Sequence, residues 1–298
     1  MAWLAIGKPM GTRTVSGYNA AVSGGVEEAM MASTNPVLER LRPSTQTSTR
    51  IAFFIAGFGM AAWAPLVPFV KSRAALTDGT LGLLLLCLGA GSIVAMPLAG
   101  FLCGRIGCRS VVITATLLVC ATLPVLAVAS SAPWLVATLL LFGAAIGSLD
   151  CAMNIQAVMV ERRSGRALMS GFHGLFSVGG IAAAAGMSGL LVAGATPLVA
   201  VLGVVLVVAA LLAVAAPHLI SKGANADSSS FAIPRGVVLF IGALCFISFL
   251  TEGAALDWSA VFLTSERGMS ASNAGWGYAV FSAAMTVGRL TGDRIVSQ

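Results

Sequence analysis

Residues 134–160 read WLVATLLLFGAAIGSLDCAMNIQAVMV, a long and almost wholly apolar run. It contains a single charged side chain, Asp150. A run of about 18 or more predominantly apolar residues is long enough to cross the roughly 30 Å hydrocarbon core of a bilayer as a helix. The stretch therefore predicts a membrane-spanning helix that holds a carboxyl group inside the bilayer.

The same pattern recurs along the chain. Its residues are 58% hydrophobic and 9% charged, against about 25% charged in an ordinary soluble domain. The apolar runs are continuous rather than alternating, which favours helices over a β-barrel. The predicted spans are 51–70, 79–103, 110–130, 134–160, 167–193, 196–216, 236–263 and 272–291. We therefore expect an all-α, polytopic membrane protein.

Polar segments divide this chain into regions. Residues 1–50 have no sustained apolar run and are predicted to form a disordered tail. Residues 217–235 are predicted to be a central loop between a bundle of about six helices, 51–216, and the start of a second bundle, 236–298. Lys and Arg concentrate on the side of the tail, so the positive-inside rule places the tail and the central loop in the cytoplasm. We expect a multi-pass protein of the plasma membrane, the inner membrane of a bacterial cell.

The two predicted bundles share a weak internal repeat. The spacing of Ala95, Met96, Arg105 and Ile106 recurs in Ala284, Met285, Arg294 and Ile295. Parallel repeats of six-helix halves are a known transporter architecture. In this alignment Gln298 corresponds to Arg109, so we expect the second copy to be truncated, with about eight of roughly twelve helices present.

Two loops resemble a signature of the major facilitator superfamily. Residues 100–109, GFLCGRIGCR, are similar to the pattern G-x-x-x-D-R-x-G-R/K-R/K of that family. The matching positions are Gly100, Arg105, Gly107 and Arg109, and Gly104 stands where the family has an acidic residue. Residues 289–294, RLTGDR, keep Asp293 and Arg294 of the same pattern. The resemblance implies a membrane transporter in which these loops take part in gating.

A further stretch resembles one branch of this family. Residues 149–154, LDCAMN, are similar to the L-D/E-x-A-x-N stretch of fucose-permease-like sugar and proton symporters. That resemblance implies transport of a small polar solute, such as a sugar, with a proton. The acidic residue that these symporters have in their first span is missing from residues 59–69. A drug-antiport signature in the fifth span is only partly present, because Leu175 and Phe176 occupy its Gly-Pro positions.

Asp150 and Asn154 are the leading site candidates. Asp150 precedes Arg162 by enough residues to lie about 18 Å from the cytoplasmic end of its helix, near the bilayer midplane. A charge at that depth costs about 2.5 to 3.5 kcal/mol and is usually found facing a bundle interior or a cavity. Asn154 lies one helical turn further on the same face. The pair is predicted to bind solute or proton, and the alternative is a protonated carboxyl that holds two helices together.

Other polar side chains are weaker candidates. His173 lies about 10 Å into its span, so contact with Asp150 is not predicted; it serves either a proton relay or an interior hydrogen bond. Glu252 is expected to support the site, whereas Asp257, on another face of the same helix, is expected to anchor it at the interface with Trp258.

Three further features of the sequence are given expected roles, and for one of them two interpretations stay open. Trp63 either stacks on a sugar ring or packs in the core. Gln156, on a different face from Asn154, is not expected in the site. The small residues of 179–191 are expected to allow close helix approach.

No motif for an enzyme, a metal or a cofactor is found in a usable context. The six cysteines have no metal-ligand spacing and are expected to be packing residues. We expect no enzymatic activity, no cofactor and no nucleic-acid partner. The expected protein is a monomer in the lipid bilayer that handles a small polar solute and a proton. The alternatives are a drug or metabolite exporter, or a truncated membrane protein without transport activity.

Overall fold

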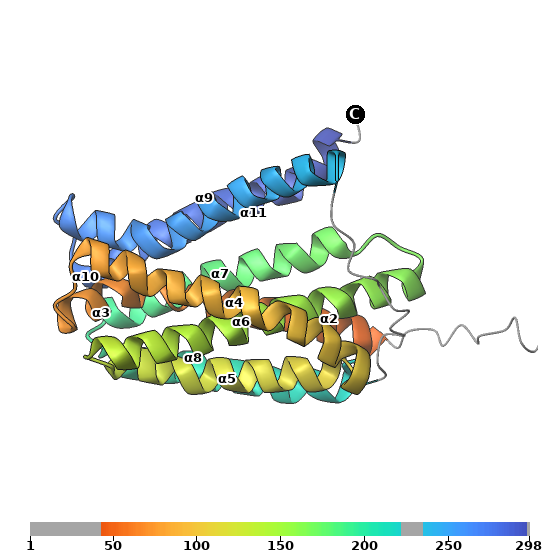
Figure 1. Cartoon of the computed structure of the whole chain (residues 1–298), viewed down its shortest axis with the longest axis horizontal. Helices are drawn as coiled ribbons and strands as arrows, with labels where there is room; N and C mark the ends of the chain where they lie inside the picture. The colour runs from red at the N-terminus through yellow and green to blue at the C-terminus, as the bar shows by residue number, and fades with distance from the viewer. Residues whose placement is uncertain (1–42, 222–234, 297–298) are drawn as a thin grey trace, which may run out of the picture. The chain divides into compact units, whose positions relative to one another are not determined.

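The computed structural model of the chain describes residues 43–221 and 235–296, and the side chains of 44–221 and 235–288. All regular structure in these residues is helical, so the all-α prediction is confirmed. The helices are α2 (Pro43–Ala61), η1 (Ala64–Leu66), α3 (Val67–Arg73), α4 (Asp78–Ile106), α5 (Cys108–Val128), α6 (Ala132–Ser164), α7 (Met169–Val192), α8 (Pro197–Ala215), η2 (Ala216–His218), α9 (Val237–Ser265), α10 (Ala271–Ala274) and α11 (Trp276–Val296) (Figure 1).

Seven helical segments among the described residues are long and apolar enough to cross a membrane. They coincide with the first seven predicted spans, α2, η1 and α3 together forming the first. The eighth predicted span, 272–291, corresponds to α10 and α11, and α11 is not among the seven. Its sequence includes Arg289, Asp293 and Arg294, which make its last turns polar.

Two predicted boundaries shift in the structure. The first helix begins at Pro43, so residues 43–50 are helical rather than part of a disordered tail. Ser48 and Thr49 are buried, because this first turn packs in the bundle. Residues 1–42, the rest of the predicted tail, lie outside the described residues. The predicted central loop begins with η2 and the buried residues Leu219 and Ile220, and its residues 222–234 also lie outside the described part.

Figure 1 shows successive long helices running in opposite directions, so each loop marks one of two ends of the bundle. We call the end that holds the α4–α5 loop the signature end, and the end that holds the α3–α4 loop the opposite end. The main helix contacts are those of α4 and α5 with α6, and of α2 and α11 with α7. Figure 1 shows α9 and α11 side by side, and these two helices contact each other. The first half of α9, residues 237–250, is exposed, whereas Leu256, Ala260 and Val261 near the opposite end are buried.

Glycines set the closest helix contacts. A Cβ added at Gly91 or Gly143 would meet the backbone of the facing helix in the α4–α6 pair, and one at Gly57 or Gly179 would do so in the α2–α7 pair. The close approach expected of residues 179–191 is thus found at Gly179 but not along the whole stretch. A Cβ added at Gly186 or Gly189 would have nothing within 4 Å, and both glycines are exposed.

Gln156 ties three segments together at the signature end. Its side-chain amide donates to Thr49 Oγ1 at 2.9 Å, and its carbonyl oxygen accepts from the Ile220 backbone N–H at 3.3 Å. The Ile220 carbonyl in turn accepts from the Arg109 backbone N–H at 3.1 Å. This buried amide, which was not expected in the site, connects α2, α6 and the chain after η2 to the first turn of α5.

Candidate functional site

A cavity of about 420 Å³ lies among α2, α4, α6, α7 and α9. Its polar lining comes from Ser92, Asp150, Asn154, His173 and Glu252. Its apolar lining comes from Ala56, Met60, Met96, Ile146, Gly147, Phe176, Phe249 and Gly253. The structure thus brings four of the five predicted binding residues to one cavity.

Asp150 and Asn154 lie one helical turn apart on α6 and are both partly buried. The Asn154 side-chain amide donates to the Asp150 backbone carbonyl at 2.9 Å and to Asp150 Oδ1 at 3.3 Å. These bonds hold the carboxylate against its own helix and orient it on the cavity wall. Gly147, one turn before Asp150, meets Ser92 of α4 closely, so α4 and α6 together form one side of the cavity.

Glu252 reaches the same cavity from α9, a helix that is far from α6 in the sequence. Asp150 and Glu252 are both partly buried, and both line this cavity. Two carboxylates that line one cavity repel each other, and the repulsion is stronger in a partly dehydrated site than in water. The cavity therefore favours a proton or another positive charge between them.

His173 also lines the cavity, although its position in the sequence did not predict contact with Asp150. Its ring meets the Phe53 ring edge-on, with the centroids 5.1 Å apart, and Phe53 stacks on Phe172 at 5.5 Å. This aromatic contact fixes the imidazole between the core of the bundle and the cavity. His173 is thereby held at the cavity wall.

Trp63 and Asp257 do not line this cavity: the structure agrees with the core interpretation of Trp63, and it differs from the interfacial role expected of Asp257. Trp63 has no exposed surface, packs on Phe142 and donates its indole N–H to Asp257 Oδ1 at 3.1 Å. Trp63 is therefore a core residue rather than a stacking platform for a sugar. Asp257 bonds to the first bundle rather than anchoring α9 at the interface. Sequence patterns do not reveal this pair, because the two residues are 194 positions apart.

The hydrogen bond from Trp63 to Asp257 is expected to stabilise the contact between η1 and α9. Trp63→Phe keeps an aromatic ring in the core but removes the donor, and leaving a buried acceptor without its donor costs about 1 to 3 kcal/mol. We expect a free energy of unfolding lower by about that amount, measured by thermal unfolding of purified protein in one detergent. Trp134→Phe is the matched control, because Trp134 is 67% exposed. Equal losses in the two variants would contradict the assignment.

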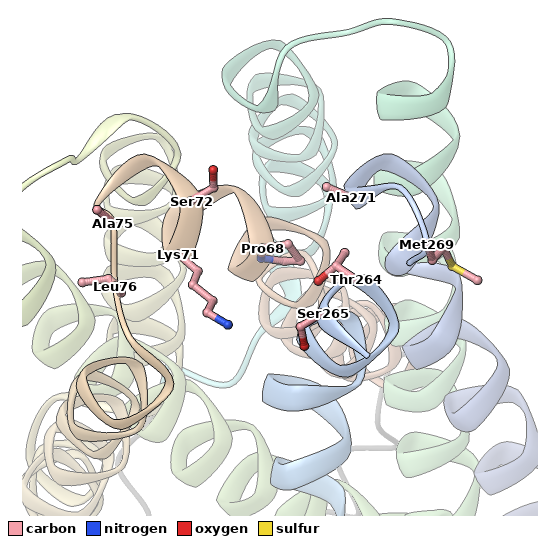
Figure 2. Close-up of a pocket in the computed structure, with 9 residues that line it drawn as sticks. All are labelled: Pro68, Lys71, Ser72, Ala75, Leu76, Thr264, Ser265, Met269 and Ala271. Carbon is pink, nitrogen blue, oxygen red and sulfur yellow. The ribbon is translucent and has the colours of Figure 1, made fainter. Parts of the chain in front are cut away.

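A second cavity, of about 410 Å³, lies at the opposite end between α3 and the end of α9. Figure 2 shows Lys71 extending from α3 toward the end of α9, where Ser265 lies. Lys71 forms an ion pair with Asp78, and the Thr264 and Ser265 hydroxyls donate to the Val261 carbonyl. Lys71, Thr264 and Ser265, which line this cavity, thus already have partners. This cavity is therefore the weaker candidate.

The loop-signature residues of the first bundle lie at the signature end. Gly107 has φ +87°, and a Cβ there would meet the Ser221 backbone, so glycine is required. The Arg105 guanidinium lies 5.1 Å from the centre of the Phe101 ring, and Gly100 approaches Cys151 of α6. Asp293 and Arg294 are on α11, but their side chains lie outside the described ones. The gating role of these residues stays a prediction.

No group of three or more His, Cys, Asp or Glu side chains that could hold a metal is found in the described part of the chain.

Comparison with known proteins shows similarity over most of the chain. The model of the Major Facilitator Superfamily matches residues 50–298. An uncharacterised MFS-type transporter of Yersinia pestis is 58% identical over 255 residues, which are 85% of this chain and 66% of that protein. An uncharacterised transporter of Sinorhizobium fredii is 32% identical over 83% of this chain and 66% of its own length. Membrane protein MosC of Rhizobium meliloti is 32% identical over 84% of this chain and 62% of its own length. The chain therefore spans about two thirds of the length of these curated relatives.

Proposed function

Because the chain belongs to the Major Facilitator Superfamily, we propose that it acts as a secondary transporter that moves a small polar solute across the membrane by alternating access. In this mechanism two helical bundles move around a binding site near the bilayer midplane, which opens to one side and then to the other. The proposal agrees with the names of two of the relatives, which are described as transporters.

The observation that supports this proposal most directly is the composition of the larger cavity wall. One part of the wall comes from α2, α4, α6 and α7, and the other part from α9, which follows the predicted central loop. A solute bound there would touch both sets of helices at once. Relative movement of the two sets would then change access to the solute.

Asp150 is the proposed proton carrier of this site, with Glu252 and His173 as the groups that exchange protons with it or with the solute. A carboxyl group that takes up a proton when the site opens to one side of the membrane, and releases it when the site opens to the other, couples solute movement to a proton gradient. Asn154 keeps Asp150 on the cavity wall through its two hydrogen bonds. The resemblance of residues 149–154 to the fucose-permease-like branch supports symport of solute and proton.

Uptake into liposomes tests the proposal. Purified protein is reconstituted, and uptake of labelled sugars, polyols, amino sugars and quaternary amines is followed with an acidic exterior and again without a pH gradient. At least one solute is expected to enter faster than into protein-free liposomes, and to accumulate when the exterior is acidic. Rates equal to those of protein-free liposomes for every solute would overturn the proposal.

A further inference from the structure

The charges on the cavity wall are unevenly distributed. Two carboxylates, Asp150 and Glu252, line the cavity, and the described lining residues include no lysine and no arginine. His173 is the one described lining side chain that can become positive. The wall is thus acidic, with one carboxylate on each of the two sets of helices.

This charge pattern discriminates between classes of solute. The two carboxylates share one cavity, which Asp150 lines from α6 and Glu252 from α9. An anionic solute would add a third negative charge to a partly dehydrated site, and a neutral solute would leave the repulsion between the carboxylates unchanged. A cation placed between them is attracted to both, so it gains the most from binding.

The apolar lining of the cavity also suits a cationic solute. Phe176 and Phe249 offer aromatic rings, whose faces attract ammonium groups. Met60 and Met96 add polarisable thioethers, which adapt to small ligands of different shapes. Carboxylates together with aromatic rings are a suitable environment for an alkylammonium group.

We propose that the solute of this cavity is a small organic cation with an ammonium group, held between Asp150 and Glu252. Ser92 and the Asn154 amide add hydrogen-bonding capacity for hydroxyl groups elsewhere on the solute. A volume of about 420 Å³ lies in the range of small-ligand sites, so the solute is small. This inference rests on the proposed function only in treating the cavity as the solute site.

Binding of matched pairs of probes tests the charge preference directly. Choline and 3,3-dimethylbutan-1-ol have nearly the same shape, but only choline has a permanent positive charge. Glucosamine and glucose share a sugar ring and differ only at C2, where glucosamine has an ammonium group and glucose has a hydroxyl. Equilibrium binding of each labelled probe to the purified full chain is expected to be about tenfold tighter, or more, for the cation of each pair.

Variants locate the preference at the cavity. Glu252→Gln and Asp150→Asn keep the side-chain volume but remove one charge each, so each is expected to reduce the preference for choline by severalfold, and the double variant to abolish it. Glu266→Gln is the matched control, because Glu266 lies just beyond the end of α9 and is exposed. Thermal unfolding of each variant shows whether it is folded.

The outcomes separate this inference from the proposed transport. Equal affinity for charged and neutral probes, no saturable binding of either cation, or an unchanged preference in the folded double variant would each overturn the inference. Uptake of a neutral solute without any preference for cations would overturn it while leaving transport intact. Selective binding of the cations without uptake would support the inference and count against transport.

Discussion

Asp150→Asn is expected to abolish the accumulation of solute that a pH gradient drives, while slower, passive equilibration through the protein continues. Each pH unit corresponds to about 1.4 kcal/mol per proton, so coupling to one proton supports up to about tenfold accumulation per unit of gradient. An asparagine does not bind a proton in this range, and the variant is therefore expected to bring internal and external concentrations only to equality. The measurement is the steady-state ratio of labelled solute inside and outside proteoliposomes.

The control for this experiment is Asp78→Asn. Asp78 is also acidic and lies at the start of α4, but its side chain is 68% exposed and forms an ion pair with Lys71 away from the larger cavity. Its removal is expected to leave accumulation at the level of the parent protein. Full accumulation by the Asp150→Asn variant would contradict the role of Asp150, because the gradient would then act through another group.

The alternative role of Asp150, a hydrogen-bonded link between two helices, predicts a different result. The hydrogen bonds described for Asp150 come from Asn154 on the same helix, so loss of the charge does not break an interhelical hydrogen bond. Asparagine at position 150 still offers an oxygen to the Asn154 amide. A change in the free energy of unfolding below about 1 kcal/mol is expected, whereas loss of a buried interhelical link costs about 1 to 3 kcal/mol.

The spans and the main site pair could be predicted because both depend on local sequence. A continuous apolar run identifies a membrane helix whatever packs against it, and the spacing of Asp150 and Asn154 fixes their common face on α6. Contacts between distant segments could not be predicted in this way. The depth of His173 along its helix did not show that α7 turns it toward the same cavity as Asp150.

Trp63, Asp257 and Gln156 show the same limit. The neighbouring sequence revealed no partner for any of them, and each has its partner on a segment that only the fold brings near. The close contacts of individual glycines could not be predicted from the sequence either. The rotation of each helix about its axis decides which glycine faces a neighbour, and mean hydropathy does not reveal that rotation. Gly143 and Gly186 both lie in apolar, small-residue sequence, yet only Gly143 meets another backbone.

Gly143→Ala is accordingly expected to be strongly destabilising. A Cβ at position 143 would overlap the Leu88 carbonyl oxygen, and this obstacle is backbone rather than a flexible side-chain end. The helices α4 and α6 would have to separate, which would also loosen the reciprocal contact of Gly91 with the Leu140 backbone. Overpacking of this kind costs about 1 to 3 kcal/mol and occasionally more, and we expect the upper end because two backbones must move.

The comparison of Gly143→Ala with Gly186→Ala tests whether close backbone contact causes the loss. A Cβ at Gly186 has nothing within 4 Å, so alanine there is expected to leave the midpoint of thermal unfolding unchanged or slightly raised. Both variants are purified in the same detergent, and the midpoint and folded yield are measured. Equal midpoints for the two would mean that α4 and α6 do not approach as closely as described. Since α4 and α6 form one side of the cavity, a lower midpoint for Gly143→Ala together with weaker binding of choline would link this close helix contact to the geometry around Asp150.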